Sequence, residues 1–238
     1  MSAQRERVPD YSWLHDDMEE DLVGADWHQR AIRTLVTSLR DLARQQGWPW
    51  HIGDQLALVG WKPDGTPWRP SPDVSVHPTL GPEDREEIDV RADGPPALII
   101  EVASRTTWEY DVSLEHAGRV GKAFAYLFLG VPEYLVFDPT ARLLGTPCRG
   151  WRRVGEATQE WRPESDGRYH SQPLRISFRP EGDLLRVITP DGSPMPYDHE
   201  KDQTIAMQAQ ENAALRQELA DLRTELERLR TQRTDEQG

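Results

Sequence analysis

The run Ala97-Leu98-Ile99-Ile100-Glu101-Val102 gives the strongest indication of how this chain folds. A continuous apolar segment of this length, rich in branched side chains, predicts a strand that is buried on both faces of a sheet. Glu101 closes the run, and a carboxylate is rarely placed in such a strand unless something pairs with it or coordinates it. A second acid, Asp73, begins another strand-like run, Pro72-Asp73-Val74-Ser75-Val76. Two carboxylates at one sheet edge suit a hard divalent cation, so the two strand ends form a candidate metal site.

Upstream of this segment the sequence predicts one helix and two strands. The helix spans Asp26 to Gln46, and Gly47 can end it. Its apolar side chains recur at helical spacing: Trp27, Ile32, Leu35, Leu39 and Leu42. We expect one strand over His51 to Val59 and another that begins near Pro72 and ends before Pro78. The segment Gly81 to Pro96 is charged and rich in Gly and Pro, which is typical of a connection.

Downstream of Glu101 the sequence predicts a second helix. Asp111 or Ser113 can cap it, and it would run to Leu129 before Gly130 ends it. Glycines within this span disfavour a helix, so a later start is the alternative. On a helical wheel its expected core face consists of Leu114, Ala117, Gly121, Phe124 and Phe128.

Three further strands are expected, over Tyr134 to Phe137, around Leu174 to Phe178 and over Leu184 to Ile188. Two strands, a helix and a third strand in succession predict an α/β (α+β) domain. We therefore expect a mixed β-sheet flanked by helices.

After Pro196 the pattern changes to a heptad repeat. The seam would consist of leucines at spacings of four and three: Leu215, Leu219, Leu222, Leu226 and Leu229. Asn212 falls at an a position, a known device for fixing a parallel two-stranded register. In a parallel partner the g-position acids Glu211, Glu218 and Glu225 would face the e-position bases Arg216, Arg223 and Arg230. We expect a coiled-coil helix over 200–234 that forms a homodimer through 205–233; a solitary amphipathic helix is the alternative.

The composition is that of a soluble protein, with 37% hydrophobic and 29% charged residues among 238. No segment approaches the roughly 20 apolar residues of a membrane-spanning helix, and the N-terminus lacks the apolar core of a signal peptide. The single cysteine, Cys148, is compatible with a reducing cytoplasm. We therefore expect a cytoplasmic protein with an acidic, flexible arm over residues 1–22 and a folded domain over 23–196.

Each candidate side chain also has a plain structural explanation. Asp73 could cap the turn at which its strand begins. Glu101 could belong to a structural ion pair, and Lys122 could be an ordinary solvated charge on a helix. Because that helix directly follows the Glu101 strand, Lys122 could instead reach back toward the two carboxylates.

A longer pattern surrounds these residues. Pro72-Asp73-Val74 and Ile100-Glu101-Val102-Ala103-Ser104 are followed by Lys122, by Tyr126 and by Gly130-Val131-Pro132-Glu133-Tyr134-Leu135-Val136-Phe137-Asp138-Pro139. Together these segments resemble the Uma-type putative restriction endonuclease family, which belongs to the PD-(D/E)XK nuclease superfamily. The resemblance covers the chain from about Trp27 to Pro190, and it implies a restriction-endonuclease-like fold.

The resemblance also implies a metal-dependent endonuclease that hydrolyses phosphodiester bonds of DNA. Asp73 and Glu101 would bind Mg²⁺, or Mn²⁺ as the alternative ion, and Lys122 would complete the catalytic set. Ala103 stands where the superfamily usually has its lysine, so Lys122 on the following helix would take that role. Extra residues between Asp111 and Lys122 depart from the family pattern and could displace the lysine.

The formal net charge of −13 argues against an extended nucleic-acid surface, because duplex binding depends on cationic neutralisation of phosphates. Much of the acidity lies in Asp16-Asp17-Met18-Glu19-Glu20-Asp21, which could lie away from any cleft. The alternative to a DNA endonuclease is therefore a catalytically inactive interaction protein that keeps the nuclease fold and dimerises through its coiled coil.

Overall fold

The computed structural model describes residues 18–62, 65–116, 119–155 and 157–235. The acidic arm expected over residues 1–22 therefore falls largely outside the described residues. Contacts between residues divide the chain into two compact units, Met1–Met195 and Pro196–Gly238. The first unit contains the β-sheets, and the second contains the long helix α5 (Asp198–Asp235).

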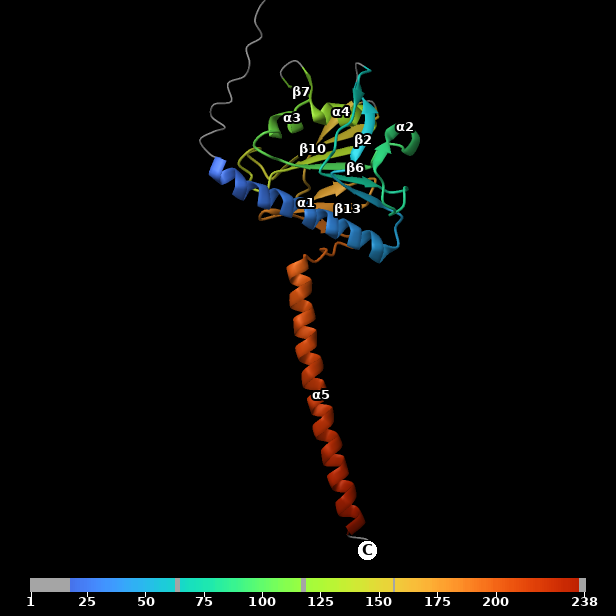
Figure 1. Ribbon diagram of the computed structural model, residues 1–238, viewed down its shortest axis with the longest axis vertical. Coiled ribbons are helices and arrows are strands. Elements are labelled where there is room, and N and C mark those ends of the chain that lie inside the picture. Colours follow the sequence, from blue (N-terminus) through green and yellow to red (C-terminus); the bar gives the residue numbers. More distant parts are fainter. Residues whose placement is uncertain (1–17, 63–64, 117–118, 156, 236–238) are drawn as a thin grey trace, which may run out of the picture. The chain divides into compact units, whose positions relative to one another are not determined.

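A six-stranded mixed sheet lies at the centre of the first unit (Figure 1). In spatial order its strands are β1 (His51–Asp54), β4 (Val74–His77), β6 (Leu98–Val102), β9 (Glu133–Phe137), β10 (Cys148–Val154) and β11 (Ala157–Trp161). β6 and β9 are parallel, whereas the other neighbours are antiparallel. All five residues of β6 are buried, which confirms the strand expected from the apolar run.

Helices cover both faces of this sheet, as expected (Figure 1). α1 (Met18–Gln46) packs against one face and α4 (Lys122–Phe128) against the other. Side chains alternate along β6, so that one core contains Leu98, Ile100 and Val102, and the other contains Ile99 and Ala103. By the same alternation Glu101 projects toward α4.

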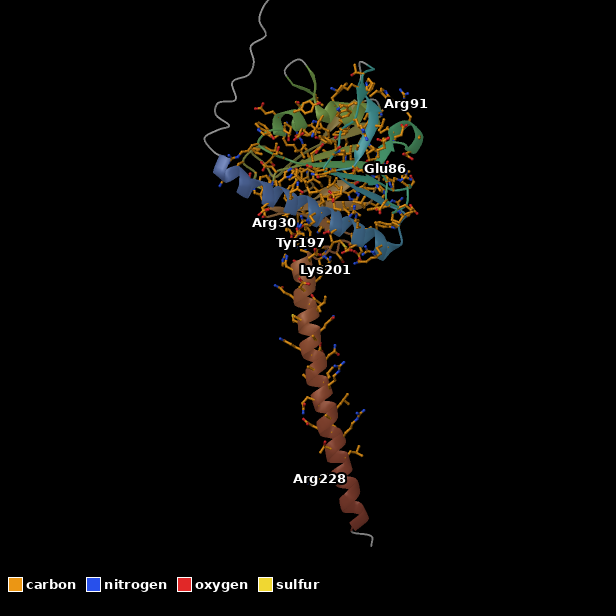
Figure 2. All side chains as sticks on the ribbon, in the orientation of Figure 1. Arg30, Glu86, Arg91, Tyr197, Lys201 and Arg228 are labelled. Carbon is orange, nitrogen blue, oxygen red and sulfur yellow. The ribbon has the colours of Figure 1, made fainter. Side chains whose placement is uncertain are left out.

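Three smaller sheets complete the described part of this unit. β12 (Tyr169–Ser171), β13 (Ile176–Glu181) and β14 (Leu184–Ile188) form an antiparallel sheet. β3 (Pro67–Trp68), β2 (Ala57–Trp61) and β5 (Glu87–Asp89) form the second, and the hairpin of β7 (Glu115–His116) and β8 (Arg119–Val120) forms the third. Arg30, labelled on α1 in Figure 2, pairs with Asp183 in the β13–β14 turn and ties the helix to the first of these sheets.

The structure corrects several boundaries expected from the sequence. α1 starts at Met18 rather than Asp26, and the segment 18–25 contains no proline that would interrupt the helix. The expected strand His51 to Val59 is divided into β1 and β2. The break falls at Gln55, whose φ of 50° lies outside the extended region.

The segment Gly81 to Pro96 is more than a connection. It contains β5 and the short helix α2 (Val90–Asp93), which Asp89 caps by accepting a hydrogen bond from the Arg91 amide. Ile88 in β5 is fully buried. The charged residues around this one apolar side chain concealed the strand in the sequence pattern.

The helix expected from Asp111 or Ser113 to Leu129 is wrong in its first half. This segment forms α3 (Trp108–Val112), the β7–β8 hairpin and α4, so the later start is correct. The predicted core face is wrong as well, because it assumed one continuous helical phase across the hairpin. Three side chains assigned to that face are exposed instead: Leu114 (46%), Phe124 (38%) and Phe128 (44%).

The second unit consists largely of α5, which spans 38 residues. The side chains that are described project from it up to Arg228 (Figure 2). The described leucines of the heptad seam are about half exposed: Leu215, Leu219, Leu222 and Leu226. The parallel coiled coil stays a prediction. In the described part of the chain, no helix is both long and apolar enough to cross a membrane.

Candidate active site

The ends of β4 and β6 bring the two predicted carboxylates together. Val74 pairs with Ile100 in antiparallel register, so Asp73 and Glu101 lie one residue beyond that pair on adjacent strands. The Asp73 amide donates to Glu101 Oε2 (3.3 Å), and the Val102 amide donates to Asp73 Oδ2 (2.8 Å). Both acids are buried, with 9% and 3% of their surface exposed.

Lys122 and Tyr126 approach Glu101 from α4. Lys122 Nζ lies 3.1 Å from Glu101 Oε1, and the Tyr126 hydroxyl donates to the same oxygen (3.0 Å). A spacing of four residues places both side chains on one side of the helix. The structure therefore brings together all three side chains of the predicted set, Asp73, Glu101 and Lys122.

Asp111 is a fourth member of this cluster. The sequence suggested it as a helix cap, but it lies within α3 and is 1% exposed. Its Oδ1 is 2.8 Å from Lys122 Nζ, and the Thr107 hydroxyl donates to its Oδ2 (2.7 Å). Lys122 is thus held between two buried carboxylates, which fixes its ammonium group at the strand end.

The extra residues before Lys122 do not displace it. They form the β7–β8 hairpin, and the chain then returns so that the Gly121 amide donates to the Leu114 carbonyl (3.0 Å). A Cβ atom at Gly121 would lie only 2.0 Å from the Ser113 carbonyl oxygen. Only glycine fits this close approach, which sets the first residue of α4 beside α3.

His28 of α1 is a site residue that the sequence reasoning missed. Its Nε2 lies 3.0 Å from the Val102 carbonyl oxygen and 3.7 Å from Asp73 Oδ2. Because a carbonyl only accepts, Nε2 carries the proton in this contact. One signal was available: His28 precedes Ile32 by four residues and so falls on the apolar stripe that faces the sheet.

The cluster contains more buried negative charge than positive charge. Three carboxylates, Asp73, Glu101 and Asp111, surround the single ammonium group of Lys122. Burial raises the pKa of Glu101 to about 8; Lys122 opposes this shift, and Asp73 and Asp111 add to it. Burial lowers the pKa of Lys122, but Glu101 and Asp111 outweigh that effect and raise it, so the lysine stays charged.

This surplus of negative charge suits a divalent cation. Asp73, Glu101 and the Val102 carbonyl offer the oxygen ligands that Mg²⁺ prefers. Within the described ranges, no three His, Cys, Asp or Glu side chains are arranged to hold a metal ion by themselves. An ion here would therefore need the backbone carbonyl and water as ligands, which is usual for Mg²⁺ because it retains several waters.

A model of the Uma2 family, described as a putative restriction endonuclease, matches residues 22–177, more than half of the chain. The chain belongs to the Uma2 family. All five side chains of the cluster fall within the matched span of this Uma2 protein: His28, Asp73, Glu101, Asp111 and Lys122. No curated protein matches the chain.

Family membership confirms the resemblance that the sequence motifs indicated, and the mixed sheet with its flanking helices fits a restriction-endonuclease-like fold. It supports a nuclease-like function for this Uma2 protein and a nucleic acid as its substrate. Restriction-endonuclease-like proteins generally use divalent metal ions, which agrees with the charge of the cluster.

Proposed function

We propose that this Uma2 protein is a metal-dependent endonuclease that hydrolyses phosphodiester bonds of DNA. The observation that carries the proposal is the position of Lys122 Nζ, 3.1 Å from a Glu101 carboxylate that is hydrogen-bonded to the Asp73 backbone. Two acids at adjacent strand ends, together with a lysine that reaches them from α4, are the side chains that this chemistry requires.

Asp73, Glu101 and the Val102 carbonyl would hold Mg²⁺, or Mn²⁺ in its place. When bound, such an ion polarises a phosphoryl oxygen and lowers the pKa of a bound water. His28 Nε2–H donates a hydrogen bond to the Val102 carbonyl oxygen and so orients that oxygen, as residues around metal ligands commonly do.

Lys122 would act as a fixed cation rather than as a base. The carboxylates around it raise its pKa, so it retains its proton at neutral pH. A charged ammonium at this point can orient the attacking water and stabilise the negative charge that develops on the phosphate. Asp111 would keep the ammonium group in place through its 2.8 Å contact.

Single alanine substitutions test this assignment. Asp73→Ala, Glu101→Ala and Lys122→Ala should each abolish Mg²⁺-dependent cleavage of DNA, measured on single-stranded and double-stranded substrates. Glu109→Ala is the matched control, because Glu109 is an exposed acid on α3, and it should cleave as the wild type does. Cleavage that persists in all three site variants would overturn the proposal.

The exposed leucines of α5 favour a second candidate, a catalytically inactive nuclease-fold protein that dimerises through a parallel coiled coil. This candidate predicts that the full chain is a dimer in solution and that deletion of residues 205–238 makes it a monomer. Calorimetry with Mg²⁺ separates the two candidates, because only the endonuclease requires the ion to bind. A full-length chain that is monomeric in solution would contradict the second candidate, which requires a dimer.

A further inference from the structure

A groove of about 580 Å³ lies where α1 ends and β1 begins. This volume is within the range of small-molecule sites. The groove combines aromatic rings with cationic side chains, and its lining comprises Arg40, Ala43, Arg44, Gly47, Trp48, Trp50, His51, Ile52, Pro82 and Asp84. We call it the Trp–Arg groove.

The end of α1 fixes the aromatic part of this groove. Gly47 adopts a φ of 65°, its amide donates to the Arg44 carbonyl (3.3 Å), and the Trp48 amide donates to the Ala43 carbonyl (2.9 Å). These bonds form a Schellman cap, which reverses the chain over the helix end. Trp48 then stacks on Trp50 with ring centroids 4.4 Å apart, so a rigid two-ring platform lines the groove.

Two guanidinium groups supply positive charge beside the platform. Arg40 donates to the Ile52 carbonyl (3.1 Å), which holds its head at the groove and leaves other N–H groups for a ligand. Arg44 pairs with Asp41 (2.7 Å) and is 76% exposed. The lining itself contains two arginines and one acid, Asp84, whereas Asp41, which pairs with Arg44, is not part of the lining.

His51 adds a third polar group to the lining. It is 6% exposed, and its ring interacts with the backbone of Gly81 and Glu83, on either side of Pro82 in the lining.

We propose that the Trp–Arg groove binds a nucleotide of single-stranded nucleic acid, with its base on the tryptophan platform and its phosphate on Arg40 and Arg44. Stacking platforms beside cationic grooves are the general means by which proteins bind single strands without sequence preference. In a chain of net charge −13, nucleic-acid binding depends on such local clusters of cations.

The groove is separate from the candidate active site. His51 pairs with His77 at one end of the β1–β4 pair, whereas Asp54 pairs with Val74 at the other end, next to Asp73. The separation of three residue steps is about 10 Å along the strands. The choice of nucleic acid as the ligand rests on the proposed function, but binding at the groove needs neither metal nor cleavage.

Fluorescence anisotropy of a labelled oligothymidylate tests the proposal with the full-length protein in EDTA, where no Mg²⁺ supports cleavage. Arg44→Glu should weaken binding at least tenfold and reduce the slope of log affinity against log salt, since each phosphate contact contributes about 0.7 to that slope. Arg162→Glu is the matched control: Arg162 is 79% exposed and pairs with Glu160 at 2.7 Å, much as Arg44 does with Asp41. It should bind as the wild type does.

Trp48→Ala should weaken binding roughly 5- to 150-fold, the range that base stacking contributes, without changing the salt slope. Trp48→Phe keeps a ring and should retain most of the affinity, which separates stacking from a folding defect. Asp84→Ala should strengthen binding by removing the acid of the lining. Binding in EDTA and Mg²⁺-dependent cleavage are measured separately for each groove variant, so a failed nuclease assay and a failed groove are distinguishable.

Three outcomes would overturn the inference: equal affinity of Arg44→Glu and Arg162→Glu, unchanged affinity of Trp48→Ala, or weaker binding by Asp84→Ala. Competition by thymidine monophosphate shows whether the groove binds a nucleotide within a strand or a free mononucleotide. Weak competition by the mononucleotide supports a strand-binding groove. Competition as strong as that of the unlabelled oligonucleotide would show a mononucleotide site and contradict the assignment to a strand.

Discussion

The candidate active site should reduce the stability of the metal-free protein, and Glu101→Gln tests this directly. Burial, with Asp73 and Asp111 adding to it and Lys122 opposing it, raises the pKa of Glu101 from 4.5 to about 8. Above pH 4.5 the unfolded chain releases a proton that the folded protein retains until about pH 8. The folded state therefore loses stability as the pH rises through this window.

The magnitude follows from the size of the shift. At about 1.4 kcal/mol for each pKa unit, the shift from 4.5 to about 8 destabilises the protein by about 5 kcal/mol at pH 8.5. Glutamine keeps the shape of the side chain, and its oxygen can still accept hydrogen bonds from Lys122 and Tyr126. Its NH₂ group would replace the oxygen that accepts from the Asp73 N–H, and the loss of that hydrogen bond costs about 1–3 kcal/mol. The variant should thus be about 2–4 kcal/mol more stable than the wild type, with a Tm higher by roughly 4–16 °C.

Urea unfolding of both proteins in EDTA measures this difference. The variant should be the more stable protein at pH 8.5, and the advantage should disappear at pH 5, where the folded wild type is protonated at Glu101. Added Mg²⁺ should stabilise only the wild type, because a ligand stabilises the state that binds it. A variant that is less stable than the wild type at pH 8.5 would refute the reasoning.

Three further predictions concern neighbouring features. Gly121→Ala should lower cleavage strongly, because its Cβ would meet the Ser113 carbonyl oxygen at 2.0 Å and shift Lys122; an unchanged rate would contradict the close approach. His28→Ala should weaken Mg²⁺ binding by about 10- to 100-fold in calorimetry, whereas His28→Gln should retain part of it; equal affinity of all three proteins would exclude a role for His28. Burial is the main cause, and repulsion from His51 the second, that lowers the pKa of His77 from 6.5 to about 4. Because the unfolded chain binds the proton first, the free energy of unfolding should fall by about 3 kcal/mol as the pH drops from 6.5 to 4. His77→Asn should flatten this part of the unfolding curve, and an unchanged pH profile would show that His77 is accessible to protons in the folded state.

Periodicity predicted the part of the site that β6 carries. The apolar run identified a strand buried on both faces, and strand alternation alone places Glu101 on the side opposite Leu98, Ile100 and Val102. The pairing of β4 with β6 was a hypothesis, since two acids in separate strands meet only if the strands are neighbours. Strand pairing depends on long-range contacts, which local patterns do not contain.

Local patterns failed where tertiary contacts override them. The apolar residues from Asp111 to Leu129 recur at the spacing of one helix. Gly121, however, lies against the Ser113 backbone, a close contact that does not arise inside a continuous helix. The hairpin before it changes the helical phase, so the face with Phe124 and Phe128 is exposed. Lys122 and Tyr126, which the wheel for one continuous helix placed on a stripe beside the core face, both contact Glu101 of the sheet.

His28 and Asp111 illustrate a second limit. His28 lies on α1, far before β4 in the sequence, and Asp111 lies on α3, beyond the loop that follows β6. Each has a common structural explanation when seen alone. Only their distances to Val102 and Lys122, 3.0 and 2.8 Å, distinguish them from a helix-face histidine and a helix cap.

A diffraction experiment on crystals grown with Mn²⁺ tests most directly whether the two strand-end acids bind a divalent cation. The proposal predicts an anomalous peak between the Asp73 and Glu101 carboxylates that also contacts the Val102 carbonyl oxygen, and it predicts no such peak in Asp73→Ala crystals. Wild-type crystals grown with saturating Mn²⁺ that show no peak at this position would contradict the metal site. A peak that persists in Asp73→Ala crystals would contradict it as well.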